Sequence, residues 1–238
     1  MIPTSIDGTD ITGATIDGTD VQEITVDGDV VFTAGPDIPD AGDLRARYDF
    51  SLEDGTTPVT DQTGNGHNLS GTYSGVSTKT INGVQAGYFD GNDLLQTTWP
   101  NVSEPYHIFV VGRFIGVEQD IMFDGASSDE HFLEEKIPNE GTWQISNGNR
   151  LQDGTADLND HVFTFAADGS FDRLRVDGTQ VISGNAGTSD STGFTLGGRG
   201  DGTNRHELAI GEVLFYPQDK SSIELNVESY LTNKWGPF

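Results

Sequence analysis

The chain contains no cysteine and few basic residues. Disulfides are therefore absent, and sheet packing, bound ions or oligomerisation must stabilise the fold. Only 12 of the 238 residues are Lys or Arg, against 38 Asp or Glu, which gives a formal net charge of -26. A surface of this sign repels nucleic acid and anionic membranes, so we exclude both as main partners.

The sequence also lacks a long apolar run. No stretch approaches the roughly 18 apolar residues of a membrane-spanning helix, and the first residues have no basic n-region or apolar core of a secretory signal. A protein that acts outside a cell without a signal would leave by lysis, inside a virus particle. The acidic excess is typical of proteins that work in molar salt, where screening acts within about 3 Å. An acidic mesophilic protein is the alternative.

Residues 5–34 repeat a ten-residue phrase three times. An Asp-Gly pair begins at Asp7, Asp17 and Asp27, each between β-branched residues, and this pattern predicts β-hairpins with two-residue turns. Isolated hairpins are marginally stable at best. We therefore expect residues 1–34 to be an assembly module that joins copies of the chain, with packing on its own main domain as the alternative. The apolar positions assigned to assembly are Ile6, Ile11, Ile16, Val21, Val26 and Val31.

The rest of the chain divides into a linker and one large domain. Residues 35–43 contain two prolines and predict an extended, semi-rigid linker. From residue 44 to 238, short apolar-alternating runs separated by turn residues predict a β-sandwich. Residues 221–235 predict one helix, with Ser221 as N-cap and Glu224 completing a capping box. Its apolar face is expected to pack on the sandwich, through Ile223, Val227, Tyr230, Leu231 and Trp235.

Several segments carry a resemblance to a known fold. Asp61-Gln-Thr-Gly-Asn-Gly, Tyr88-Phe-Asp-Gly-Asn-Asp-Leu-Leu and the closing Glu228-Ser-Tyr-Leu-Thr-Asn-Lys-Trp-Gly match its turns and C-terminal helix in order. Residues 44–238 thus resemble the concanavalin A-like, laminin-G-like jelly-roll domains. The resemblance implies an all-β jelly-roll sandwich with one C-terminal helix, here preceded by a small β-hairpin repeat module. This fold hosts lectins, enzymes and structural modules, so it does not fix the function.

The N-terminal repeat carries a second resemblance. Residues 21–32 are similar to segments of haloarchaeal viral and surface proteins, which implies a virion or cell-surface setting. We therefore predict a structural surface protein of a halophilic archaeal tailed virus, as a capsid decoration, turret or tail-fibre component. It would form a homo-oligomer through residues 1–34, touch other virion proteins, and contact host glycans with a lectin-like domain. The alternative is an extracellular carbohydrate-binding module or glycan-active enzyme of a halophile.

The sequence offers little for catalysis. The Glu-x-Asp-x-(x)-Glu motif of laminarinase-type members of the fold, which places two carboxylates on one sheet face, is absent. There is no Gly-x-Ser-x-Gly elbow, and the five histidines are dispersed. We therefore predict no catalytic residues and no enzyme activity. For the glycan-active alternative, Glu134 and Glu212 are the carboxylate candidates.

One turn offers oxygen ligands for an ion. Asp90, Asn92 and Asp93 lie in a Gly-containing turn and supply the hard oxygens that calcium prefers. The same residues form an ordinary Asx-type turn in the alternative interpretation. Calcium is the only cofactor that we predict.

Four residues are candidates for glycan binding. Trp99 and Trp143 are the predicted aromatic platforms, Asn147 is a hydrogen-bonding partner, and Arg199, or in its place Arg205, is expected to bind an acidic sugar. In the alternative, the aromatic rings belong to the core of the sandwich.

Overall fold

The computed structural model describes residues 37–116, 121–135 and 140–238, together with the short strands between Ser5 and Thr33. The chain divides into two compact units, Met1–Asp37 and Ile38–Phe238. In the described part of the chain, none of the helices has the length and apolar character needed to cross a membrane.

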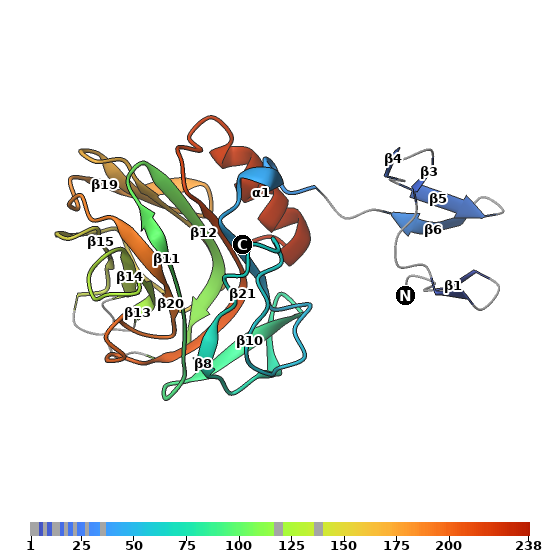
Figure 1. Cartoon of the computed structure of the whole chain (residues 1–238), viewed down its shortest axis with the longest axis horizontal. Helices are drawn as coiled ribbons and strands as arrows, with labels where there is room; N and C mark the ends of the chain where they lie inside the picture. Colours follow the sequence, from blue (N-terminus) through green and yellow to red (C-terminus); the bar gives the residue numbers. More distant parts are fainter. Residues whose placement is uncertain are drawn as a thin grey trace. The chain divides into compact units, whose positions relative to one another are not determined.

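The first unit consists of hairpins. Three antiparallel pairs, β1 (Ser5–Ile6) with β2 (Thr9–Asp10), β3 (Thr15–Ile16) with β4 (Thr19–Asp20), and β5 (Glu23–Val26) with β6 (Asp29–Thr33), form separate two-stranded sheets (Figure 1). Each pair is joined across an Asp-Gly pair, so the predicted hairpins are confirmed. Of the assembly positions, Ile6, Ile16, Val26 and Val31 lie on these strands, whereas Ile11 and Val21 lie outside the described residues.

The second unit is a sandwich of two antiparallel sheets (Figure 1). The first sheet has the order β19 (Thr179–Gly184), β18 (Asp172–Val176), β17 (His161–Ala167), β12 (Tyr106–Phe114), β21 (Glu207–Tyr216), β10 (Val84–Asp90), β9 (Val76–Ile81), with β7 (Ala46–Asp49) also paired to β21. The second has the order β16 (Arg150–Asp153), β15 (Trp143–Ser146), β14 (Phe132–Glu135), β13 (Ile121–Asp124), β20 (Ser191–Leu196), β11 (Leu94–Val102), β8 (Ser70–Thr72). The predicted all-β sandwich with one C-terminal helix is confirmed.

The first sheet is buried on both faces, which explains its nearly continuous apolar strands. On β12, Ile108 and Val110 face the core between the sheets, whereas Phe109 and Val111 belong to a second apolar cluster that includes the helix. Successive side chains of a strand point to opposite faces. A strand covered on both sides therefore needs apolar residues at every position rather than at alternate ones.

Helix α1 (Glu224–Trp235) covers the outer face of this sheet and buries Val227, Tyr230, Leu231 and Trp235. The predicted capping box is wrong. The N-cap is Ile223, with no side-chain hydrogen bond to the helix. Ser221 instead donates its hydroxyl to Asp219 and accepts from Arg173, and Glu224 also accepts from Arg173. Ion pairing with the sheet has displaced the local cap.

The start of the sandwich unit is fastened next to this helix. The short 3-10 helix η1 (Ala41–Asp43) lies within the predicted linker. Lys220 donates to Asp40 at 2.8 Å and to Asp43 at 2.6 Å, and the Tyr216 hydroxyl donates to the Pro39 carbonyl at 2.6 Å. We call these contacts the entry clamp. They hold the segment that leads into β7 on the end of β21.

Candidate functional site

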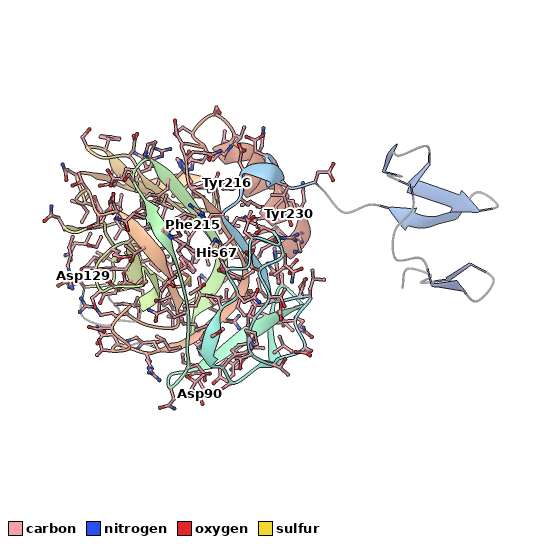
Figure 2. The ribbon with its side chains drawn as sticks, in the orientation of Figure 1. His67, Asp90, Asp129, Phe215, Tyr216 and Tyr230 are labelled. Carbon is pink, nitrogen blue, oxygen red and sulfur yellow. The ribbon has the colours of Figure 1, made fainter. Side chains whose placement is uncertain are left out.

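Both predicted aromatic platforms lie in the core. Trp99 is 6% exposed and Trp143 is 1% exposed. The Trp99 ring packs 4.8 Å from Phe215, which Figure 2 shows inside the sandwich, and the Trp143 ring packs 5.2 Å from Phe163. A ring enclosed between two sheets cannot stack on a sugar that arrives from solvent. The prediction is therefore wrong for both tryptophans, and the alternative of core packing holds.

Arg199, the cation predicted to bind an acidic sugar, already has an ion-pair partner in the protein. The Arg199 guanidinium donates to Asp129, and Arg150 approaches the same carboxylate at 3.4 Å. The charge of Arg199 is therefore offset by its neighbour, and the residue is not placed to hold an acidic sugar. Asn147 is fully buried and lies in a different polar cluster, described below. The structure does not bring the four predicted glycan residues together.

The predicted calcium ligands form a hydrogen-bonded turn at the periphery, where Figure 2 shows Asp90. Asp93 accepts from the backbone N–H groups of Ser74 at 2.9 Å and Asp90 at 3.0 Å, and Asp90 accepts from the N–H of Asn92 at 2.8 Å. These contacts account for the turn without an ion. Across the described residues no group of three or more His, Asp or Glu side chains is arranged to hold a metal. Calcium stays a prediction.

The two carboxylates named for the glycan-active alternative have structural partners. Glu134 accepts from the Gln144 amide at 2.9 Å. Glu212 is fully buried beneath α1. It accepts from Arg47 at 2.8 Å, Lys234 at 2.7 Å, Tyr230 at 3.0 Å and Trp235 at 3.0 Å. All the accepting capacity of Glu212 is used by the protein itself, so it joins the helix to the sheet rather than facing a ligand.

A different polar cluster lies at one end of the sandwich, and we call it the acid–amide cluster: Glu104, Tyr106, Asn147 and Asp172. The Tyr106 hydroxyl donates to Oδ1 of Asn147 at 2.9 Å, and Nδ2 of Asn147 donates to Glu104. Because Tyr106 uses the amide oxygen, the NH₂ group faces Glu104.

Strand ends bring these residues together. Tyr106 is the first residue of β12, Asp172 is the first residue of β18, and Asn147 follows β15 directly. Antiparallel pairing places the start of one strand beside the end of the next, so these termini meet at one end of the sandwich. Asp172 is fixed further by the backbone N–H groups of Asp168 at 3.0 Å and Ala186 at 2.6 Å.

The charges at this end have one sign. Burial and the negative charge of Asp172 raise the pKa of Glu104 to about 7, and burial also raises the pKa of Asp172. No Lys or Arg in the described part of the chain forms an ion pair with either carboxylate. A neighbouring histidine is also unusual: His131 lies 3.5 Å from the Tyr106 hydroxyl, and burial lowers its pKa to about 3.

An exposed ring lies next to this cluster. Phe171 directly precedes Asp172 and is 53% exposed, although large apolar residues are usually covered. It closes a turn in which its N–H donates to the Asp168 carbonyl at 3.3 Å. Gly169 in the same turn has φ of 63°, and a Cβ there would lie 3.2 Å from Oε2 of Glu104. The turn therefore passes close to the cluster.

Sequence reasoning missed Glu104, Phe171 and Asp172. One signal was available for Phe171. The segment Asp168-Gly-Ser-Phe-Asp places a large apolar residue within a turn, where polar residues are expected. Nothing in the sequence pairs residue 104 with residues 147 and 172, because only the strand order brings them together.

Comparison with solved structures supports the fold. Trypanosoma rangeli sialidase in complex with sialic acid matches with a TM-score of 0.61 at 12% identity, over 91% of this chain and 36% of the sialidase. Domain 4 of AbnA, a GH43 extracellular arabinanase from Geobacillus stearothermophilus in complex with arabinotriose, matches with a TM-score of 0.52 at 17% identity, over 73% of this chain and 91% of that domain. The receptor binding domain of botulinum neurotoxin C/D mosaic serotype matches at 0.57 and 11% identity, over 80% and 51%.

No protein-family model matches the chain, and no curated protein matches it in sequence. The resemblance of residues 21–32 to haloarchaeal viral and surface proteins therefore stays a prediction. The chain spans little more than a third of the sialidase, which exceeds it in length. At these identities the structural likeness establishes the β-sandwich fold alone.

The neighbours contradict the prediction that the protein is not an enzyme, because the sialidase and the arabinanase are glycosidases. That prediction rested on the missing laminarinase-type motif. The motif is one arrangement of carboxylates on a strand, and its absence says nothing about carboxylates that different strands bring together. Glu104 and Asp172 are such a pair.

Proposed function

We propose that residues 38–238 form a glycan-binding domain whose ligand lies against the exposed Phe171 ring and the half-buried Glu104 carboxyl at the edge of the acid–amide cluster. The exposed Phe171 ring beside Asp172 is the observation that carries this proposal. An aromatic face offers an apolar surface to the C–H face of a sugar, while carboxylates and hydroxyls exchange hydrogen bonds with its hydroxyl groups. Two neighbours of the same fold were solved with sialic acid and arabinotriose, which supports a saccharide ligand.

The charge of the site favours a neutral glycan. The charges that act most strongly on Glu104 are those of Asp172 and Asp168, both negative. A sugar carboxylate placed there would meet like charge without a cation to compensate it. We therefore expect binding of neutral oligosaccharides such as arabinotriose, and much weaker binding of sialic acid.

Calorimetric titration with arabinotriose and with sialyllactose tests this proposal. Phe171→Ala should weaken binding of arabinotriose about tenfold, the loss typical of an anchoring aromatic residue. Leu52→Ala is the matched control, because Leu52 is 65% exposed elsewhere on the surface. Equal affinities for Phe171→Ala and the parent protein would remove Phe171 from the site.

Glycoside hydrolysis is a second candidate function. The observation that favours it is a carboxyl with a pKa raised to about 7, Glu104, which accepts from the Asn147 amide and lies within the field of a second carboxyl, Asp172. In most glycosidases, one carboxyl stays protonated to donate to the leaving oxygen while a second carboxylate acts on the sugar. The half-buried Glu104 would be the general acid, and the fully buried Asp172 would keep it protonated through its negative charge rather than touch the sugar.

Hydrolysis assays on arabinan and other neutral glycans test this role. Glu104→Gln should lower the rate at least about a hundredfold, whereas Glu140→Gln, at an exposed position, should leave it unchanged. The acid must be protonated to act, so activity should fall as the pH rises above about 7. Full activity of the Glu104→Gln protein would exclude this mechanism.

The predicted setting belongs to the same proposal. Copies of the chain would assemble through residues 1–34 and display the sandwich on the surface of a virus particle of a halophilic archaeon. Three separate two-stranded hairpins without a shared sheet support the need for a partner. The sialidase, the arabinanase domain and the neurotoxin domain are not named as virion proteins, so the virion setting stays a prediction.

The native mass in molar salt tests assembly. A stable oligomer that becomes a monomer when residues 1–34 are deleted is the expected result. A full-length monomer at micromolar concentration would contradict it.

A further inference from the structure

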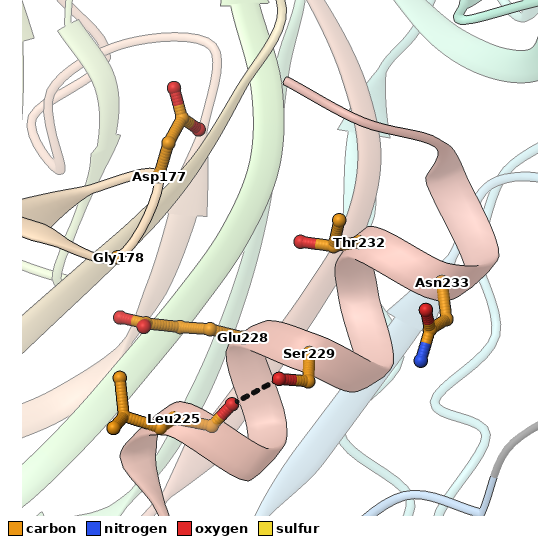
Figure 3. Close-up of a pocket in the computed structure, with 7 residues that line it drawn as sticks. All are labelled: Asp177, Gly178, Leu225, Glu228, Ser229, Thr232 and Asn233. Carbon is orange, nitrogen blue, oxygen red and sulfur yellow. Dashed lines mark hydrogen bonds between the residues drawn. The ribbon is translucent and has the colours of Figure 1, made fainter.

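A groove separates the C-terminal helix from the β18–β19 turn. Figure 3 shows the side chains of Leu225, Glu228 and Thr232 directed toward the side of this turn. The groove has a volume of about 410 Å³, within the roughly 300–1,000 Å³ of small-molecule sites. It is lined by Asp177, Gly178, Leu225, Glu228, Ser229, Thr232 and Asn233. None of these residues belongs to the acid–amide cluster.

The two carboxylates in the groove already have hydrogen-bonding partners within the protein. Glu228 accepts from Arg175 at 2.8 Å and from the Thr164 hydroxyl at 2.9 Å. Asp177 lies 2.6 Å from Nδ1 of His161, whose pKa is raised by hydrogen bonds to Asp177 and Asp157 in spite of burial. Both carboxylates of the groove therefore already have a basic partner, whereas neither carboxylate of the acid–amide cluster has one among the described residues.

The helix side presents polar groups without other partners. Within the described residues, the side chains of Thr232 and Asn233 form no hydrogen bond. The Ser229 hydroxyl donates to the Leu225 carbonyl at 2.7 Å, and its lone pairs remain available (Figure 3). The Leu225 side chain is 63% exposed beside them. One wall thus combines an apolar patch with a hydroxyl, a second hydroxyl and an amide.

We propose that this groove is a second saccharide site, for a neutral sugar ring. A ring of this class has a C–H face to lie on Leu225 and hydroxyls to bond Ser229, Thr232 and Asn233. The carboxylates of Asp177 and Glu228 provide further hydrogen-bond acceptors for the hydroxyls of the sugar. The site is independent of Phe171, and two sites on one domain would raise the avidity for a polymeric glycan.

Site-resolved NMR titration of the full chain with arabinotriose tests the proposal. The backbone amides of Gly178 and Asn233 lie on opposite walls and should shift together and saturably. Ser229→Met fills the groove and should weaken this response about tenfold. Asn226→Met is the matched control, because Asn226 is exposed on the same helix but does not line the groove.

The outcomes separate this proposal from the first one. Groove shifts that persist in the Phe171→Ala protein, with loss in Ser229→Met and retention in Asn226→Met, support a second site. Absence of groove shifts, an unchanged response in Ser229→Met, or loss of the response in Phe171→Ala would overturn it. A fall in native mass caused by Ser229→Met would also overturn it, because the groove would then hold a second copy of the chain.

Discussion

Two groups of carboxylates in the sandwich differ in their partners. Between α1 and the first sheet, Glu212, Glu224 and Glu228 are each paired with Arg or Lys. The cations there are Arg47, Arg173, Arg175 and Lys234, four of the 12 in the chain. At the acid–amide cluster, Glu104 accepts from the Asn147 amide and Asp172 accepts from two backbone N–H groups, and neither pairs with a cation among the described residues. Four of the scarce cations thus fasten the helix, whereas the pKa values of Glu104 and Asp172 are raised, as is common at functional sites.

The largest expected effect comes from removing the charge of one ion-paired carboxylate beneath α1. Glu212→Gln would leave Lys234 and Arg47 with Asp49 as their one shared buried counter-charge, and we expect the free energy of unfolding to fall by about 3 kcal/mol. Urea denaturation followed by tryptophan fluorescence measures this directly, since all three tryptophans lie in the sandwich.

Glu140→Gln is the control for that measurement. Residue 140 is exposed, so the substitution should change the free energy of unfolding by less than about 0.5 kcal/mol. A loss below about 1 kcal/mol in Glu212→Gln would show that the buried pairs are not what fastens α1.

An intermediate effect on stability is expected from replacing His131, which lies beside the acid–amide cluster. Its pKa is about 3 in the folded state and 6.5 as the reference value, so the unfolded state binds the extra proton and stability falls as the pH drops below 6.5. His131→Phe should remove this loss, giving the variant a relative gain of about 2 kcal/mol between pH 7 and pH 5. Denaturation of both proteins at the two pH values measures the gain. Parallel pH profiles would contradict it.

The smallest effect, with the opposite pH dependence, is expected at Glu104. Its pKa rises from 4.5 to about 7 on folding, so its contribution to stability is full below pH 4.5 and is lost as the pH rises through 7. Glu104→Gln should abolish this loss. Because the carboxyl is partly exposed, water screens much of the cost, and we expect a relative gain of about 1 kcal/mol from pH 4.5 to pH 8. The same denaturation series measures it, and a destabilised variant at pH 8 would place Glu104 with the fastening carboxylates.

Local chemistry made part of the fold predictable. The Asp-Gly pairs specify their hairpins because few residues other than Gly accept the turn's backbone angles. The apolar spacing of Val227, Tyr230, Leu231 and Trp235 specified the buried face of the helix. The capping box failed, because Arg173 comes from a strand that lies about fifty residues earlier in the chain. Local signals predict local contacts, and a distant charge can override them.

The candidate site was less predictable for the same reason. A tryptophan has the same sequence signature in a core as on a surface, and Trp99 and Trp143 proved to be core residues. Asn147 was identified as a polar site residue, but its partners were not. Glu104 and Asp172 become neighbours only through the order of strands in two sheets, which spacing along the chain does not specify.

The entry clamp has a mechanical consequence. Any pull on the chain ahead of Pro39 reaches Lys220 and Tyr216 before it reaches the four-residue strand β7. A force applied directly to β7 would break its contacts with β21 one residue after another. A force applied through the entry clamp acts on two ion pairs and one hydrogen bond at the same time. Tension applied through the N-terminal segment is therefore borne first by the contacts at the end of β21, a strand with partners on both sides, and not by β7.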